Sequence, residues 1–250
     1  MLEIYEREEN SSADSSLPFF KQGLEISELD YKRGGFGDLE KLMEFRDNPR
    51  YIIRSITLEA VQSQFEGKFG PLEAAQKAKG LFDELRQKYS IVAPVDFVVG
   101  KSEDGTPLLF TITEKIKGQD IEDVDYDPSK KDVIVIHFED HYASLVRYFI
   151  DKFNSDDFAL WDIGKSSAYV YGEKEGDSSD QLYLVDTDIR CEKGRQAISN
   201  LCDIFPTIAM LEEKFGLRFD TVREELRNFV TSVKDDKVWW IKQFNEFLST

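Results

Sequence analysis

Two histidines and two cysteines are the first residues whose types and spacing suggest chemistry. His137 and His141 stand four residues apart in HFEDH, so a helix would place both on one face, as a metal-binding pair requires. The order is not HExxH and no third ligand is evident, so we favour an ordinary pair of surface or core histidines. Cys191 and Cys202 form no CxxC pair in a chain of this length, and we expect free thiols.

The charge of the chain restricts its partners. The 250 residues carry a net charge of −17, which repels nucleic acid backbones and anionic membranes, so we expect neither as a partner. The same charge opposes long-range attraction of ATP, so a nucleotide site would need local positive groups or a bound metal ion. Cationic substrates would be attracted, although solubility alone explains an acidic surface. No apolar run approaches the roughly 20 residues that cross a bilayer. The acidic N-terminus lacks the layout of a secretory signal, and we expect a cytoplasmic location.

The first half of the chain predicts five strands and one helix. Residues 72–89 place apolar side chains at a helical period, and Pro71 suits the first turn of that helix. The strands are apolar, β-branched or loosely alternating and are separated by turn signals; in chain order they are LEISELDYKR, LEKLMEF, YIIRSI, VDFVVG and PLLFTITEKI. Tight connections between the first three predict an antiparallel meander.

The second half predicts mostly helices. The acidic stretch GQDIEDVDYDPSKKD is a candidate junction between two lobes, and HFEDHYASLVRYFIDKF is amphipathic. AYVYG and QLYLVD, separated by a turn-like segment, indicate a hairpin, and several amphipathic helices follow from about residue 196. We therefore expect an α+β fold with an N-terminal arm at 1–23, a nucleotide-binding lobe at 24–116 and a helical lobe at 117–250.

This order of elements resembles the two-lobed kinase-like fold, and within it the aminoglycoside/choline phosphotransferase group. The similarity spans about residues 24–188 and lies in the order and spacing of its motifs. It implies a five-stranded antiparallel N-lobe with one main helix, followed by a mostly helical C-lobe that carries the catalytic loop. It also implies ATP and Mg²⁺ as cofactors and a small-molecule acceptor.

The resemblance assigns phosphate-binding roles in the N-lobe. Gly34, Gly35 and Gly37 match the glycine turn whose backbone N–H groups approach the phosphates, since a side chain there would block that approach. Arg54 in YIIRSI stands where kinases place a lysine, and arginine can bind phosphate with two parallel donors. The carboxylate that braces this cation is Glu73 or Glu84; we prefer Glu73 slightly. An ordinary hairpin turn, an exposed strand cation and a solvated glutamate are the alternatives.

The hinge and the catalytic loop complete the match. TITEKIKGQDI resembles the hinge, where backbone groups around Glu114 to Ile116 would bind the adenine edge. In LWDIGKSS, Asp162 matches the catalytic aspartate, and Ser167 stands at the position of a metal-binding asparagine. In YLVDTD, Asp186 matches the metal aspartate and Asp188 adds a second carboxylate. In such a site one carboxylate orients the acceptor hydroxyl and another holds Mg²⁺ against the phosphates.

Two departures from the family pattern leave three readings open. Leu160-Trp161 replaces the usual His-Gly, and serine replaces asparagine at position 167. The leading hypothesis is an ATP- and Mg²⁺-dependent phosphotransferase. The second is a pseudokinase that serves as a nucleotide sensor or protein-binding module, which would have a protein partner. The third is an interaction protein that binds no nucleotide. For Asp162 itself, the alternative to a catalytic role is a structural turn residue.

Overall fold

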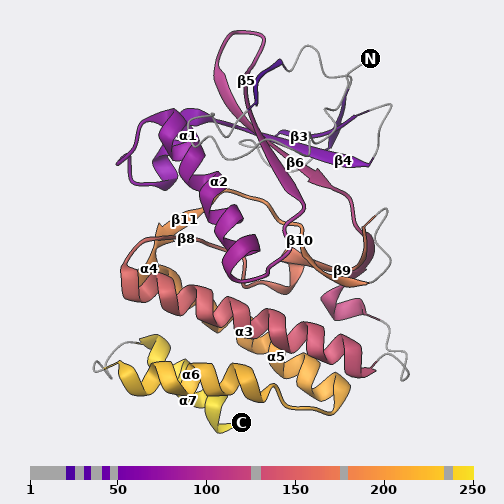
Figure 1. Ribbon diagram of the computed structural model, residues 1–250, viewed down its shortest axis with the longest axis vertical. Helices are drawn as coiled ribbons and strands as arrows, with labels where there is room; N and C mark the ends of the chain where they lie inside the picture. Colours follow the sequence, from indigo (N-terminus) through magenta and orange to yellow (C-terminus); the bar gives the residue numbers. More distant parts are fainter. Residues whose placement is uncertain are drawn as a thin grey trace, which may run out of the picture.

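The computed structural model of this chain combines helices with strands in layers (Figure 1). Only the backbone is described for its first three strands. The described residues are 21–25, 31–34, 41–45, 50–124, 131–174, 180–233 and 239–250.

A six-stranded sheet forms one end of the molecule, in the order β1-β5-β6-β4-β3-β2. Its two central strands, β4 (Tyr51–Thr57) and β6 (Pro107–Glu114), pair antiparallel over their whole lengths. The remaining members are β1 (Lys21–Glu25), β2 (Tyr31–Gly34), β3 (Lys41–Phe45) and β5 (Val95–Lys101). The β-branched residues of β4 suit a pleated, half-buried strand, and Ile53 and Ser55 are its buried members.

The prediction of five antiparallel strands is corrected at the start of this sheet. The segment LEISELDYKR was expected to form one strand, but it contributes to both β1 and β2, which lie at opposite edges. β1 pairs parallel with β5, whereas β2 pairs antiparallel with β3. Local alternation predicts an extended backbone but says nothing about which edge it joins, so the sequence could not separate the two strands.

Two helices cover one face of the sheet. The helix expected at 72–89 is α2 (Pro71–Lys88), and the short α1 (Leu58–Gln64), which the sequence analysis did not anticipate, follows β4 directly. Phe82 of α2 packs against Phe97 of β5, with ring centroids 5.3 Å apart. Arg86 of α2 donates a hydrogen bond to the carbonyl of Val95 (2.9 Å). These contacts hold α2 against β5. From there the helix runs toward the helical layer (Figure 1).

A helical layer forms the other end of the molecule. Its longest member is α3 (Lys131–Ser155), and α6 and α7 lie on the side away from the sheet (Figure 1). The others are α4 (Gly194–Ala197), α5 (Leu201–Phe215), α6 (Asp220–Ser232) and α7 (Trp239–Ser249). A Cβ atom on Gly194 would lie 1.8 Å from the carbonyl oxygen of Lys152, so only glycine permits this close approach of α4 to α3.

Two small antiparallel sheets lie between these layers. The predicted hairpin is β9 (Tyr169–Glu173) with β10 (Gln181–Leu184), and β7 (Lys117–Asp120) pairs with the other edge of β9. The second sheet pairs β8 (Phe158–Leu160) with β11 (Cys191–Lys193). Short 3-10 turns η2 (Ile121–Asp123), η4 (Ser166–Ala168) and η5 (Ile198–Asn200) connect the elements.

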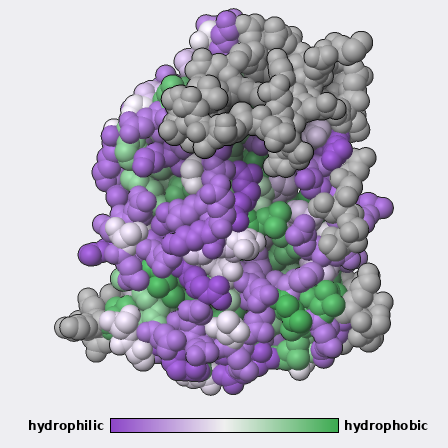
Figure 2. All heavy atoms as spheres, in the orientation of Figure 1, coloured by the Kyte–Doolittle hydropathy of each residue, from purple (hydrophilic) through white to green (hydrophobic). Residues whose placement is uncertain are grey.

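The visible surface is mainly hydrophilic, with apolar residues in separate patches (Figure 2). Such scattered apolar exposure is ordinary for folded chains. Within the described ranges, no helix combines the length and apolar character that crossing a bilayer requires.

Candidate functional site

The loop after β8, which carries Asp162, meets the segment that leads into β11, because the end of β8 pairs with the start of β11. Leu160 at the end of β8 pairs with Cys191 at the start of β11. One residue further, the Trp161 amide donates to the Arg190 carbonyl (2.7 Å). Antiparallel pairing thus places the loop after β8 beside the segment that precedes β11, although 24 or more residues separate them in sequence.

Asp162 occupies an unusual backbone conformation between two cations. Its φ angle is +66°, in the left-handed region that non-glycine residues seldom adopt. Lys165 Nζ lies 2.6 Å from Asp162 Oδ1, and Arg190 Nη1 lies 3.3 Å from Oδ2. The carboxylate is only 13% exposed, so these ion pairs balance a charge that water reaches poorly. Strained backbone of this kind clusters at functional sites, which makes Asp162 a reasonable candidate.

Asp186 and Asp188 are held by backbone and side-chain hydrogen bonds. The amides of Val185 and Asp186 both donate to the carbonyl of Ala168, at 2.8 and 3.2 Å. The Asp188 amide donates to Asp186 Oδ1 (3.3 Å). Between them, Thr187 is buried and its Oγ1 lies 3.1 Å from Oγ1 of Thr113 on β6. This contact joins the acidic segment, residues 186–188, to β6 of the large sheet.

Arg54 joins the two carboxylates. Its Nη1 atom lies 2.9 Å from Asp186 Oδ1 and 2.5 Å from Asp188 Oδ1. All three side chains are partly buried, so the contact combines charge with hydrogen bonding in a region of incomplete solvent screening. Arg54 pairs with Thr111 across β4 and β6, so the two side chains lie on the same face of the sheet. The segment 186–188 meets Arg54 on that face.

Of the other predicted phosphate and metal ligands, the structure describes Ser167 and Gly34. Ser167 is exposed in η4, one residue before the Ala168 carbonyl that binds the Asp186 amide. Gly34 pairs with Leu42, and Leu42 pairs with Arg54, so Gly34 lies in the same row of the sheet, two strands from Arg54. Gly35 and Gly37 lie outside the described residues.

The predicted hinge already uses two of its backbone donors. The amide of Glu114 donates to the Pro94 carbonyl (3.0 Å), and that of Lys115 donates to the Arg50 carbonyl (2.7 Å). The Glu114 side chain is buried and accepts from Arg50 Nε (2.6 Å), with Lys174 Nζ at 3.2 Å. Glu114 therefore ties β6 to neighbouring segments, and its own N–H is not a donor for an adenine edge. Ile116 is half-buried just before β7.

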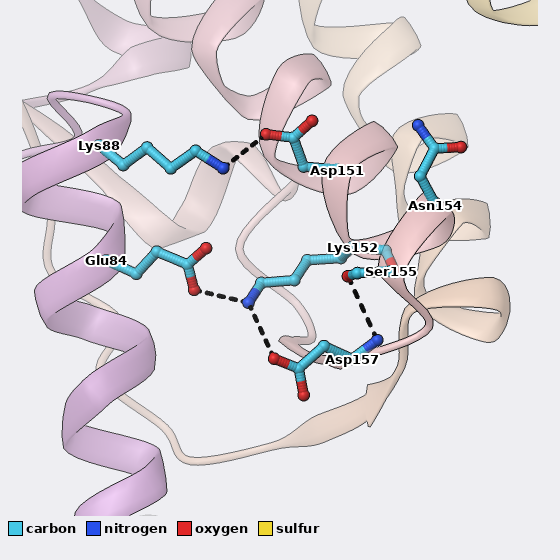
Figure 3. Close-up of a pocket in the computed structure, with 7 residues that line it drawn as sticks. All are labelled: Glu84, Lys88, Asp151, Lys152, Asn154, Ser155 and Asp157. Carbon is cyan, nitrogen blue, oxygen red and sulfur yellow. Dashed lines mark hydrogen bonds and ion pairs between the residues drawn. The ribbon is translucent and has the colours of Figure 1, made fainter.

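The two candidate brace residues on α2 do not contact Arg54. Glu73 is exposed in the first turn of α2. Glu84 turns instead toward α3, where its Oε2 atom accepts from Lys152 Nζ at 2.5 Å (Figure 3). The expectation that a glutamate of α2 contacts Arg54 is thus corrected: Asp186 and Asp188 contact it instead. A helical spacing shows which side chains share a face, but not which partner that face meets.

Glu84 lines a polar cavity of about 520 Å³ between α2 and the end of α3 (Figure 3). Lys88 Nζ lies 2.8 Å from Asp151 Oδ2 there, and hydrogen bonding to Asp151 raises the pKa of Lys88. The Tyr89 hydroxyl also donates to Asp151 (2.6 Å), and its burial raises the pKa of Tyr89 to about 12. These contacts anchor α2 to the helical layer, at a place separate from Arg54.

Three features of the site were missed from the sequence. Lys165 and Arg190 were not identified as partners of Asp162, and the threonine pair that holds the acidic segment was not foreseen. Lys165 is three residues from Asp162, a spacing that a turn makes adjacent, so its role had a local signal. Arg190 and Thr113 meet their partners only through strand pairing and packing.

The acidic segment suits a hard divalent cation completed by a phosphate ligand. Asp186 and Asp188 offer carboxylate oxygens, and Ser167 offers a hydroxyl nearby. Mg²⁺ typically takes one or two carboxylates plus substrate phosphates. Among the described residues, no group of three or more histidine, cysteine, aspartate or glutamate side chains forms a closed metal cage. The two carboxylates and the hydroxyl would therefore leave most coordination positions of a divalent cation to other ligands.

No family model and no curated protein matches this chain. Among solved structures, it is similar to the ternary complex of APH(2″)-IIa with streptomycin and ATP, at 11% identity and a TM-score of 0.40, covering 90% of this chain and 93% of that one. It is also similar to the GDP and kanamycin complex of APH(2″)-IIia, at 14% identity and a TM-score of 0.40, covering 88% and 91%.

Proposed function

We propose that this chain is a nucleotide- and Mg²⁺-dependent phosphotransferase with a kinase-like, two-lobed arrangement. The observation that carries the proposal is the contact of Arg54 with both Asp186 and Asp188. Arg190, two residues after Asp188, contacts Asp162. A phosphate-binding cation, a pair of hard oxygen ligands and a separate carboxylate are the parts that phosphoryl transfer needs. The cation, Arg54, lies more than 100 residues before the carboxylates in the sequence.

Each residue has a distinct role in this proposal. Arg54 binds phosphate oxygens through its N–H donors, and Asp186, Asp188 and Ser167 would hold Mg²⁺. A metal held there would supply positive charge to offset the charge on the phosphates. Asp162 accepts the proton of the acceptor hydroxyl as that oxygen bonds to the γ-phosphorus. The bond to the bridging oxygen then breaks, and its electron pair leaves with the nucleoside diphosphate.

The lobes divide these tasks. The sheet of the lobe at 24–116 supplies Arg54 and, in the same row of the sheet, Gly34. The lobe at 117–250 supplies the carboxylates. ATP would enter between them. A small-molecule acceptor is supported by the short connection after Asp188, since β11 begins at Cys191 and leaves little chain to bind a peptide.

The proposal is tested by thermal unfolding with ATP, with and without Mg²⁺. A ligand at about 100 times its dissociation constant adds about 2.7 kcal/mol to stability. Asp186→Asn should remove the Mg²⁺-dependent part of this gain and abolish turnover. Asp162→Asn should leave the gain intact and lower only turnover, because its partner is the acceptor hydroxyl. Asp96→Asn, at an exposed position on β5, is the matched control and should change neither.

Two other results would replace the proposal. Wild-type protein that binds ATP but transfers phosphate to no acceptor, including water, would be a catalytically impaired nucleotide sensor. Wild-type protein that ignores ATP altogether, with or without Mg²⁺, would be an interaction protein.

A further inference from the structure

A single nitrogen atom of Arg54 occupies the position between the two candidate metal ligands. Nη1 contacts Oδ1 of Asp186 and Oδ1 of Asp188, at 2.9 and 2.5 Å. Mg²⁺ binds carboxylate oxygens at about 2.0–2.1 Å. A cation that bridged these same two oxygens would have to lie where the guanidinium nitrogen now lies.

The backbone that carries the two carboxylates is anchored. Thr187, between them, is buried and bonded to Thr113, and the Asp188 amide donates to Asp186 Oδ1. The Arg54 side chain is 27% exposed, and those of Asp186 and Asp188 are 36% and 24% exposed. Repulsion between Arg54 and a second cation is thus only partly screened by water.

We infer that Arg54 is an internal counter-ion that excludes divalent cations from Asp186 and Asp188 until phosphate binds. Phosphate oxygens compete for the guanidinium, which binds them with two parallel donors. When Arg54 turns to the phosphates, both carboxylates become available to Mg²⁺. This inference rests on the proposed function of the site and adds its regulation.

The consequence is positive coupling between nucleotide and metal. Each should raise the affinity of the protein for the other by the same factor, because coupling free energies are reciprocal. Metal alone should bind weakly to the wild-type protein, since it must break two charge-assisted contacts first.

The test is calorimetric titration of Mg²⁺ alone into wild-type protein, Arg54→Gln and Arg147→Gln. Arg147→Gln is the matched control, because it removes the same charge from a guanidinium that pairs with Glu225 on α6. We expect Arg54→Gln to bind Mg²⁺ at least about tenfold more tightly than wild type, because loss of even one of the two charge-assisted contacts corresponds to about that factor. Arg147→Gln should bind it as wild type does. Equal gains in both variants, or none in Arg54→Gln, would overturn the inference.

A second measurement on wild-type protein covers the case in which Arg54→Gln does not fold. The ¹⁵Nε–¹H signal of the Arg54 side chain is followed by NMR as Mg²⁺ is added. The inference expects this signal to shift in proportion to metal binding at Asp186 and Asp188. Metal binding at those carboxylates without any change at Arg54 would contradict it.

The outcomes separate the inference from the proposed function. If Arg54→Gln gains Mg²⁺ affinity but wild type ignores ATP, the counter-ion role stands and the phosphotransferase proposal fails. If wild type binds ATP with Mg²⁺ but the variant gains no metal affinity, the inference alone fails.

Discussion

Acid should destabilise this protein through one buried histidine. His141 lies on α3 and is 8% exposed, with its ring 4.5 Å from that of Tyr169 and 5.4 Å from that of Tyr142, between centroids. Its Nε2 atom is buried and has no hydrogen-bond partner in the described part of the chain. Burial disfavours the imidazolium form and lowers the pKa of His141 to about 3.

The sign and size of the effect follow from linkage. The unfolded chain binds a proton at His141 below a pKa of 6.5, whereas the folded chain binds it only near 3. The neutral His141 therefore costs no stability above pH 6.5. Below pH 6.5 the free energy of unfolding falls as the pH drops toward 3, because only the unfolded chain binds the proton. From pH 7 to pH 5, the free energy of unfolding should fall by about 2 kcal/mol, at 1.36 kcal/mol per pKa unit.

The assay is urea unfolding at pH 7, 6 and 5 for wild type, His141→Leu and His137→Leu. His141→Leu should lose most of the decrease between pH 7 and 5, whatever its stability at pH 7. His137→Leu, one turn earlier on the same helix and half-buried, is the matched control and should retain it. An unchanged pH dependence in His141→Leu would refute the reasoning, as would an NMR titration of His141 near pH 6.5.

Two further predictions concern the contacts that join the layers. Lys152→Met should lower the free energy of unfolding by about 1–3 kcal/mol in urea titrations, because Glu84 loses its partner but is 30% exposed and is not stranded in the core. Adding Glu84→Gln should recover part of that loss; a double variant less stable than the single one would contradict the pairing. Thr187→Val should cost about 1–2 kcal/mol by leaving Thr113 unsatisfied, and it should weaken the Mg²⁺-dependent part of ATP stabilisation. Thr187→Ser should restore both the stability and the Mg²⁺-dependent part of ATP stabilisation. If thermal unfolding shows no rescue by serine, loss of the hydroxyl is not the cause of either change.

Local patterns were enough to locate most elements. The apolar period of residues 72–89 predicted α2, and the paired apolar segments at 168–172 and 181–186 predicted the β9–β10 hairpin. These signals succeed because 3.6-residue and 2-residue periods are properties of neighbouring residues. They failed for LEISELDYKR, since its division between opposite edges of the sheet depends on long-range pairing.

The sequence by itself determined which side chains are available to a site, and the tertiary structure decided which of them meet. Arg54 and Asp186 were both assigned to one phosphate site from their places in the chain, but a helix glutamate was expected to contact the guanidinium, and Asp186 contacts it instead, at 2.9 Å. Glu84 and Glu73 stand on a helix whose direction is set by packing against β5 and α3, which no local spacing encodes. Ion pairs between distant segments depend on where whole layers lie, so the partner of a charge is a property of the fold.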